Sequence, residues 1–197
     1  MSATPESSAL ARRIARLEAR VEIRELVARY CFVVDARDIE GIGECFTHDG
    51  AFRSRDGQMD AVGRAAVIEQ FHARFAVLGP SNHFTHDHII NFDDSDAAAA
   101  TGLINTHAEV VRNGQPLWAS LRYRDEYRHE EGRWRFRERS LEFFYYLQPA
   151  QYAEVMLSAL RNHAYAVPHA AEFPETLPSW QRYYQEHPRP STFAPNK

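Results

Sequence analysis

Cysteine is scarce in this chain. Cys31 and Cys45 are its two cysteines, and neither belongs to a Cys-x-x-Cys pair or to a Cys/His set with metal-site spacing. Small secreted domains often depend on several disulfides, whereas thiols in reducing compartments stay free. We therefore expect two buried, unpaired thiols and no disulfide framework.

Long apolar runs and clustered positive charge are also missing. No apolar segment approaches the ~20 residues that a membrane-spanning helix needs, and residues 1–22 lack the apolar core of a secretory signal. The net charge is −4, the pI is near 6.2 and Lys197 is the only lysine, whereas nucleic-acid-binding domains are normally basic. The expectation is a soluble cytoplasmic protein that engages neither a membrane nor nucleic acid.

Signatures of bound cofactors are absent as well. The glycines of EGIGE, residues 40–44, are too few for a phosphate-binding loop, which argues against NAD and ATP. Neither GxSxG nor HExxH occurs, and the cysteines have no identifiable activating base. We expect a protein that works without a cofactor.

Histidine, in contrast, is concentrated at one place. His83, His86 and His88 fall within the stretch SNHFTHDHIINF, which first suggests a metal site. On a regular strand, however, His86 and His88 share a face and His83 has the opposite parity. A third ligand, such as Asp35 or Glu138, would have to come from a distant segment. We therefore expect no metal site.

The first half of the chain has the apolar periodicity of helices. Spacings of three and four predict one long helix over residues 8–34. Asp38 is placed to cap a second, short helix. A third helix is predicted over residues 62–78, ended by Gly79-Pro80. Between the second and third helices, Asp49-Gly50 predicts a turn followed by a short strand.

The second half alternates as strands do, and Asn113-Gly114 is a strong hairpin signal. Helices followed by antiparallel strands indicate an α+β fold, with the N-terminal helices packed on a strongly curved, mostly antiparallel sheet. Four strands are predicted, at residues 85–92, 97–111, 116–130 and 133–147.

The composition changes near residue 149. Residues 150–164 have the pattern of an amphipathic helix, and residues 166–197 hold six of the ten prolines. Proline interrupts helices and central strands, so we expect no regular element there, but a tail that wraps a surface or is disordered. The chain thus divides into a domain at 9–148 and a C-terminal extension at 149–197.

Two titratable residues are candidates for acid–base chemistry. Asp35 follows CFVV, the most apolar part of the first helix, and a carboxylate in such surroundings needs a partner. His83 stands between a predicted helix and the sheet. From the residues alone, each also has a simpler interpretation, as a solvated helix-end carboxylate and as a polar loop residue.

The order of four segments resembles a known family. Arg24-Glu25, Tyr30 and Asp35 form the pattern RExxxxYxxxxD, which is followed by CFTHDGAF, HFTHDHIIN and YRDEYRHEEGRWRFRER. Between roughly Ala9 and Leu147, this order resembles the SnoaL-like branch of the nuclear transport factor two-like superfamily. The resemblance implies a cone-shaped α+β barrel.

Within that branch the chain is similar to enzymes with an Asp–His dyad: scytalone dehydratase, bile acid 7α-dehydratase and hexachlorocyclohexane dehydrochlorinase. The resemblance implies three catalytic residues. Asp35 matches the dyad carboxylate, His83 matches the dyad histidine, and Tyr30 matches a tyrosine of the bile acid enzyme.

The same resemblance implies substrate contacts. His86 completes a His-x-x-His stretch like that of the bile acid enzyme, and Arg139 falls where the dehydrochlorinase has a pocket arginine. His107 lies near the strand that carries the second histidine of scytalone dehydratase. Trp118 is a further candidate, as an aromatic wall of an apolar pocket.

These residues imply a cofactor-free lyase that performs a dehydratase-type elimination on a small apolar cyclic or aromatic molecule with a carbonyl group. An isomerase or polyketide-type cyclase would use the same dyad, because it also begins by removing a carbon-bound proton. A non-catalytic ligand-binding module is a third possibility, since a fold does not fix a function. The resemblance also implies a homo-oligomer, either a trimer or a dimer.

Overall fold

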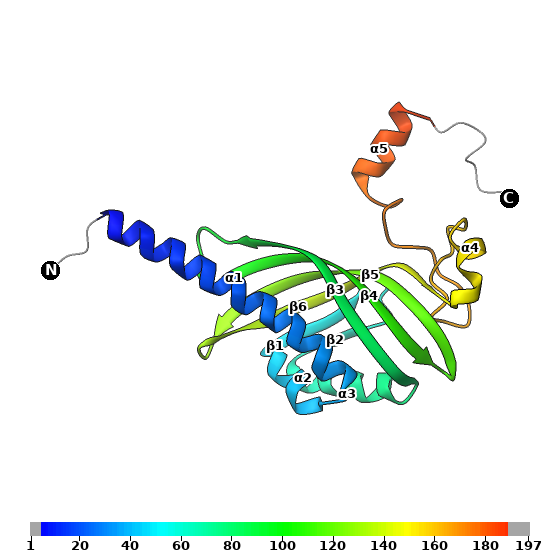
Figure 1. Cartoon of the computed structure of the whole chain (residues 1–197), viewed down its shortest axis with the longest axis horizontal. Coiled ribbons are helices and arrows are strands. Elements are labelled where there is room, and N and C mark those ends of the chain that lie inside the picture. The colour runs from blue at the N-terminus through cyan, green and yellow to red at the C-terminus, as the bar shows by residue number, and fades with distance from the viewer. Residues whose placement is uncertain (1–4, 189–197) are drawn as a thin grey trace.

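A long N-terminal helix lies across one face of a single curved sheet (Figure 1). The structure is a computed structural model and describes residues 5–188. Helix α1 (Pro5–Asp35) leads into two shorter helices, α2 (Ile39–Cys45) and α3 (Arg64–Phe75). The Asp38 carboxylate accepts a backbone hydrogen bond in the first turn of α2, so the predicted cap is present.

One six-stranded sheet forms the rest of the fold. The strands follow the spatial order β2-β1-β6-β5-β4-β3; β1 runs parallel to β6, and every other neighbouring pair is antiparallel. The predicted α+β fold, with helices on a curved and mostly antiparallel sheet, is confirmed. The strands are β1 (Phe46–Ser54), β2 (Asp60–Val62), β3 (Leu78–Phe92), β4 (Ala99–Arg112), β5 (Gln115–Glu130) and β6 (Arg133–Leu147).

Two predictions near the start of the sheet are wrong. Strand β1 runs through Asp49-Gly50, and a register shift against β6 takes the place of the predicted turn. Strand β3 begins at Leu78 and not at residue 85, because β3 is an edge strand, where a residue such as Pro80 is tolerated. Helix α3 is shorter than predicted because Val62 belongs to β2 and Leu78 to β3.

The C-terminal extension also differs from the expected pattern. The short 3₁₀ helix η1 (Pro149–Gln151) and α4 (Tyr152–Val155) replace the helix predicted over 150–164. Helix α5 (Pro178–Glu186) forms where no regular element is expected, since proline is favoured at the first position of a helix. Residues 189–197, the end of the predicted tail, lie outside the described residues.

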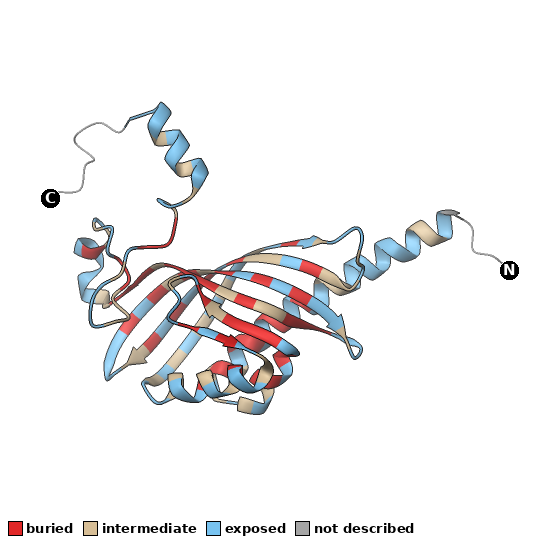
Figure 2. Ribbon diagram, turned by 180° about the vertical axis from the view of Figure 1, so that it is seen from behind, coloured by how far each residue is buried: buried red, intermediate tan, exposed pale blue. Residues whose placement is uncertain are grey.

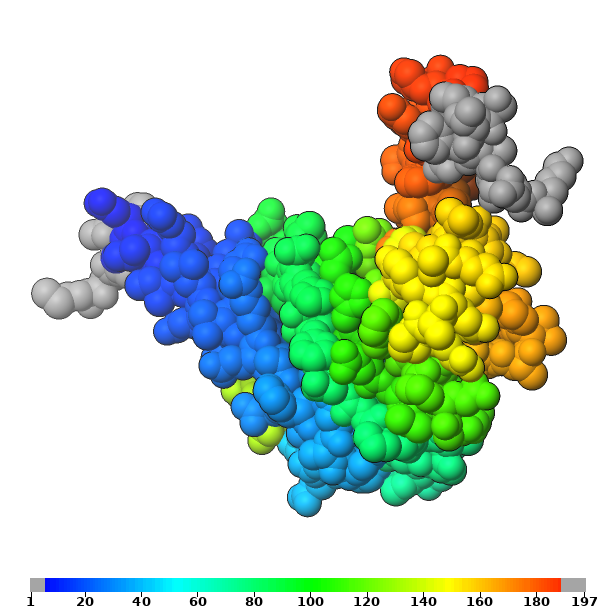
Figure 3. Space-filling model, turned by 45° about the vertical axis from the view of Figure 1, so that its right-hand side comes forward, coloured from blue at the N-terminus to red at the C-terminus, as the bar shows by residue number. Residues whose placement is uncertain are grey.

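Part of the extension packs against the sheet. The Phe173 ring stacks on Phe144 of β6 with centroids 5.6 Å apart, and the Phe143 amide donates a hydrogen bond to the Glu172 carboxylate at 2.6 Å. Figure 3 shows the segment that contains α4 covering one end of the strands, whereas α5 projects away from the sheet. Between α4 and α5 the extension therefore wraps one end of the sheet.

The first half of α1 exposes its apolar stripe. Leu10, Ile14, Leu17 and Val21 are between 47% and 64% exposed, whereas the stripe from Ile23 onward is buried. This half of the helix extends beyond the sheet and is mostly exposed in Figure 2. Within residues 5–188, no helix is both long enough and apolar enough to cross a membrane.

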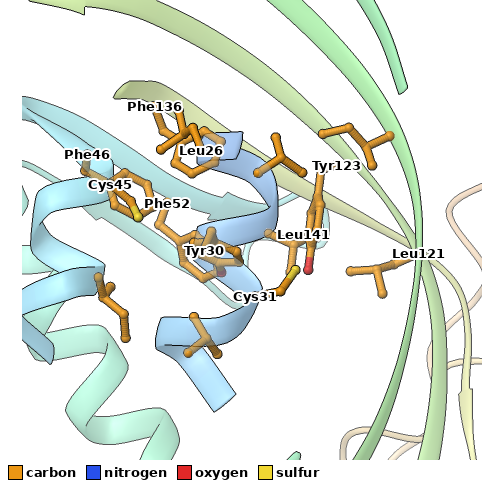
Figure 4. Packing of buried hydrophobic residues seen from close by; sticks show 14 of the residues in the cluster. Leu26, Tyr30, Cys31, Cys45, Phe46, Phe52, Leu121, Tyr123, Phe136 and Leu141 are labelled. Atoms are coloured by element: carbon orange, nitrogen blue, oxygen red, sulfur yellow. The ribbon is translucent and has the colours of Figure 1, made fainter. Parts of the chain in front are cut away.

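The core lies between the helices and the inner face of the sheet. The Tyr30 ring of α1 meets the rings of Phe46, Phe71 and Phe136 edge-on, with centroids 5.6 to 6.3 Å apart. Figure 4 shows Tyr30 within this cluster, close to both cysteines. Both thiols are free and buried, as predicted, and burial raises the pKa of each to about 11.

A buried ion pair joins the two central strands of the core. Arg139 of β6 donates from Nε to Asp125 Oδ1 at 2.9 Å and from Nη2 to Asp125 Oδ2 at 2.7 Å. Both side chains are 0% exposed. The guanidinium also lies 3.9 to 4.3 Å from the ring centroids of Tyr30, Tyr123 and Phe136, so its charge is held by one carboxylate and three aromatic faces.

Removal of the carboxylate is expected to destabilise the protein strongly. Asp125→Ala leaves the Arg139 charge buried without its partner, which costs about 3–5 kcal/mol of unfolding free energy. The double variant Asp125→Ala/Arg139→Met removes both charges and is expected to recover much of that loss. Urea denaturation followed by circular dichroism measures both values. A single variant as stable as the wild type contradicts the role given to the pair.

Candidate active site

A bulge in β3 decides which histidines face the interior. Between Thr85 and His88 the strand has one residue more than its partner β4, where Thr106 and Ile104 are the paired positions. The extra residue reverses the alternation. His83 and His88 therefore share the inner face, although the sequence predicts opposite parity for them.

Asp35 and His83 are in direct contact. Asp35 ends α1, and its Oδ1 lies 2.6 Å from His83 Nδ1, while its Oδ2 accepts a hydrogen bond from the His83 backbone amide at 2.8 Å. Because a carboxylate only accepts, Nδ1 carries the proton of a neutral imidazole and Nε2 is left as the basic nitrogen. The side chains of the pair lie mostly out of solvent, at 13% exposure for His83 and 20% for Asp35.

Further groups hold the Asp35 carboxylate. The Ser81 hydroxyl donates to Oδ1 at 2.7 Å, and Arg37 donates to the Ser81 hydroxyl at 3.0 Å. Partial burial by itself raises the pKa of Asp35, but the hydrogen bonds from His83 and Ser81 outweigh it and lower the pKa below its ordinary value. Asp35 is therefore ionised at neutral pH.

Arg37 reaches this position because of an unusual backbone conformation. Its φ of 60° lies in the left-handed region, which side chains other than glycine seldom adopt. The guanidinium also donates to the carbonyls of Val34 and Gly79 and lies 4.3 Å from the Phe75 ring centroid. Arg37 thus ties the end of α1 to the start of β3, where Asp35 and His83 meet.

A cavity lies against His83, enclosed by α1, α3, the inner face of the sheet and the C-terminal extension. Its volume is about 50 Å³, well below the ~300 Å³ at which typical ligand pockets begin. A ring-sized ligand therefore requires lining side chains to move. Polar side chains around His83 include those of Tyr30, Tyr123, Tyr146 and Tyr165, set among apolar ones.

Tyr30, the third predicted catalytic residue, lines this cavity together with His83. Burial raises the pKa of Tyr30 well above its ordinary value, although the charges of Arg139 and Arg74 oppose the rise. The hydroxyl is therefore a proton-bearing hydrogen-bond donor at neutral pH. The structure thus brings Asp35, His83 and Tyr30 to one place.

The four predicted substrate contacts lie elsewhere. His86 and His107 meet on the outer face of the sheet, with Nε2 and Nδ1 3.0 Å apart, because the bulge turns His86 outward. Trp118 is 40% exposed on the same outer face. Arg139 is buried beneath the cavity and held by Asp125. None of the four therefore lines the cavity beside His83.

His88 faces inward but belongs to the core. Tyr127 donates its hydroxyl proton to Asp125 at 2.8 Å, so the contact of 3.1 Å between His88 Nε2 and Tyr127 has His88 as the donor. A Cβ atom at Gly102 would lie 2.4 Å from the Tyr127 hydroxyl and 3.0 Å from His88 Nε2. Gly102 lies on β4, the strand between those of His88 and Tyr127, and its lack of a side chain leaves the space for this contact.

Several residues that line the cavity are not predicted from the sequence. Arg74, Arg112 and Tyr165 line it, yet they come from α3, the end of β4 and the C-terminal extension. Tyr123 shares the strand periodicity of ordinary core residues, which gives no functional signal. Among residues 5–188, no group of three or more His, Cys, Asp or Glu side chains is placed to hold a metal ion.

The fold and this site define a class: a cone-shaped α+β domain with a hydrogen-bonded Asp–His pair beside an inner cavity. The model of the SnoaL-like domain matches residues 15–140, more than half of the chain. The chain therefore belongs to the SnoaL-like family, which its sequence resembles.

Solved structures share the fold. LinA has a TM-score of 0.64 and 18% identity, over 71% of this chain and 95% of LinA. A provisionally assigned scytalone dehydratase from Novosphingobium aromaticivorans has a TM-score of 0.65 and 16% identity, over 82% and 97%. A hexachlorocyclohexane dehydrochlorinase from Novosphingobium barchaimii has 0.61 and 17%, over 68% and 92%. At these identities the likeness shows the fold. No curated protein matches the chain.

The partial burial of His88 predicts a pH dependence of stability. Burial lowers the pKa of His88 to about 4 from 6.5. Between these values the unfolded chain binds a proton that the folded chain does not, so stability falls as the pH falls. Replacing His88 by Gln is expected to flatten this decline, as measured by urea midpoints from about pH 7 to pH 5. The exposed His48→Gln is the control, and equal slopes in all three proteins contradict the assignment.

Proposed function

We propose that this protein is a cofactor-independent lyase that eliminates a leaving group from a small apolar cyclic or aromatic carbonyl compound. The observation that carries the proposal is the 2.6 Å contact of Asp35 with His83 Nδ1, on an imidazole that lines an enclosed cavity. The dehydratase and dehydrochlorinase names borne by structures with the same fold support it.

In the proposed mechanism His83 is the general base. Its Nε2 removes a proton from the carbon next to the substrate carbonyl, and the electron pair of that C–H bond forms an enolate. Asp35 holds the imidazole in the tautomer that leaves Nε2 free and stabilises the imidazolium that results. A positioned base of this kind accelerates the step by ~10²–10⁴-fold.

Tyr30 and His83 complete the elimination. The Tyr30 hydroxyl donates a hydrogen bond to the enolate oxygen, where negative charge develops. The enolate then collapses, a carbon–carbon double bond forms and the bond to a β-hydroxyl group breaks. The proton held on His83 passes to the departing oxygen, which leaves as water. The reaction consumes no cofactor, because no electrons are gained or lost overall.

Proton removal is measurable before the natural substrate is identified. In D₂O the wild type is expected to exchange the hydrogens next to the carbonyl of a cyclic ketone such as 2-tetralone, followed by NMR. His83→Ala is expected to lower the enzyme-dependent exchange rate ~10²-fold or more, because the base is lost. Asp35→Asn is expected to lower the exchange rate as well, for two reasons. The amide NH₂ can donate to Nδ1 and favour the wrong tautomer, and a neutral amide does not stabilise the imidazolium.

The controls separate the possible outcomes. His48→Ala removes an exposed histidine on β1 and is expected to exchange as the wild type does. Exchange that survives both dyad substitutions contradicts the mechanism, and binding without any exchange in the wild type indicates a ligand-binding module. A cyclic β-hydroxyketone distinguishes a lyase, which forms an enone absorbing in the ultraviolet, from an isomerase or cyclase, which returns the proton.

We also propose a homo-oligomer, a trimer or a dimer, because the α1 stripe formed by Leu10, Ile14 and Leu17 is apolar and exposed. Sedimentation equilibrium is expected to give a multiple of the 22.7 kDa chain mass. Leu17→Glu places a charge within the stripe and is expected to lower the mass, while Arg13→Glu on the same helix is the control. A wild type that sediments as a single chain contradicts the proposal.

A further inference from the structure

Two arginines of the cavity have no counter-charge. Arg74 and Arg112 both line it, and neither forms an ion pair with any residue between 5 and 188. The Nε atom of each is buried and lacks a hydrogen-bond partner within the described chain. Partly buried guanidinium groups of this kind are costly unless an anion pairs with them.

The two side chains approach the cavity from different elements. Arg74 comes from the last turn of α3, where it lies over the Phe52 and Phe71 rings and donates to the sulfur of Met59, a weak acceptor. Arg112 ends β4 and lies 5.9 Å from the ring centroid of Tyr165. Aromatic and thioether groups hold these guanidiniums in place but do not neutralise them.

Nearby carboxylates are already engaged. Asp35 accepts hydrogen bonds from Ser81 and from His83. Oδ1 of Asp56 accepts from the Ser54 hydroxyl and from the amide of Gln58, and its Oδ2 lies 3.7 Å from His169 Nδ1. The described side chains that line the cavity therefore include two arginines and no carboxylate.

This positive charge acts on the lining tyrosines. Burial raises the pKa of Tyr30, Tyr123, Tyr146 and Tyr165, and the charge of Arg74 opposes the rise in each of the four. Arg112 also opposes it at Tyr146 and Tyr165. At Tyr165 the Asp56 carboxylate acts in the opposite sense and more strongly than either arginine. An anion placed beside Tyr30, Tyr123 and Tyr146 feels the arginine charges, which favour it.

We infer that the substrate carries a carboxylate, which Arg74 and Arg112 of the cavity lining hold while its carbonyl end faces His83. The inference rests on the proposed function for the reacting end of the molecule. A planar guanidinium matches the geometry of a carboxylate and donates two parallel hydrogen bonds. The substrate class is therefore a small cyclic or aromatic carbonyl acid, with its ring against the apolar wall between the arginines and His83.

Benzoate and benzamide are suitable probes, because they have nearly the same shape and differ in charge. Ligand-observed NMR titration of the full chain is expected to show benzoate binding at least ~10-fold more tightly than benzamide, as a charged hydrogen bond allows. Arg112→Gln is expected to remove most of that difference. Arg112→Lys retains the charge and is expected to keep part of it, and Arg74→Gln tests the second arginine.

The matched control is Arg122→Gln, which removes a positive charge from the outer face of the sheet, where Arg122 donates to Asn105. Its benzoate affinity is expected to equal that of the wild type, and thermal unfolding checks that each variant is folded. Equal affinities of the wild type for benzoate and benzamide overturn the inference. So does benzoate binding that survives both Arg112→Gln and Arg74→Gln, or that falls equally in Arg122→Gln.

The same titration with His83→Ala separates this inference from the proposed function. Removing the base is expected to leave the preference for benzoate intact. A wild type that prefers benzoate but exchanges no ketone hydrogens contradicts the lyase and keeps the carboxylate site. A wild type that exchanges ketone hydrogens but does not distinguish benzoate from benzamide keeps the lyase and overturns the carboxylate site.

Discussion

The buried pair of Arg139 and Asp125 is the interaction on which the interior depends. It joins β5 to β6 at the centre of the sheet, and its charge has no access to solvent. Arg139 also lies against the Tyr30 ring of α1. Asp125 accepts a hydrogen bond from the Tyr127 hydroxyl, which in turn contacts His88 of β3. One ion pair thus links α1 and three strands. Because an isolated buried charge is so costly, these elements keep one arrangement, in which α1 ends beside β3.

That arrangement is what brings Asp35 to His83. The two residues are far apart in sequence, and the contact needs α1 to end over the start of β3. Arg37 and Ser81 reinforce the meeting point, since they connect the residues just after α1 to the first residues of β3. The stability of the core and the geometry of the candidate site therefore have a common origin.

The fold and the catalytic candidates could be predicted from the sequence because both depend on patterns within short segments. Helical and strand periodicity predict the order of elements, and the RExxxxYxxxxD pattern singles out Tyr30 and Asp35. The faces of the sheet are not predictable in the same way. One additional residue in β3 moves His83 to the face of His88 and turns His86 outward. Pattern alone does not place such a bulge, because nothing in the stretch HFTHDH marks which residue is extra.

Arg139 and Trp118 lie away from the cavity for a different reason. Their spacing in the chain is compatible with a pocket, but their surroundings in the fold place them elsewhere. Arg139 is held by a carboxylate on the neighbouring strand, and Trp118 falls on the outward parity of β5. Conversely, Arg74 and Arg112 look like ordinary surface arginines in the sequence. Only their position in a cavity lining that contains no carboxylate, with the Nε of each unpartnered within the described residues, distinguishes them.

The residues that line the cavity come from two parts of the chain: the region matched by the family model and the C-terminal extension. The SnoaL-like match covers residues 15–140 and therefore includes Tyr30, Asp35, His83 and both arginines. Tyr165, which lies under Arg112, belongs to the extension beyond that region and lines the cavity, whose volume is about 50 Å³. The matched region thus contains the proposed reacting groups, and the extension adds to the cavity wall beside them.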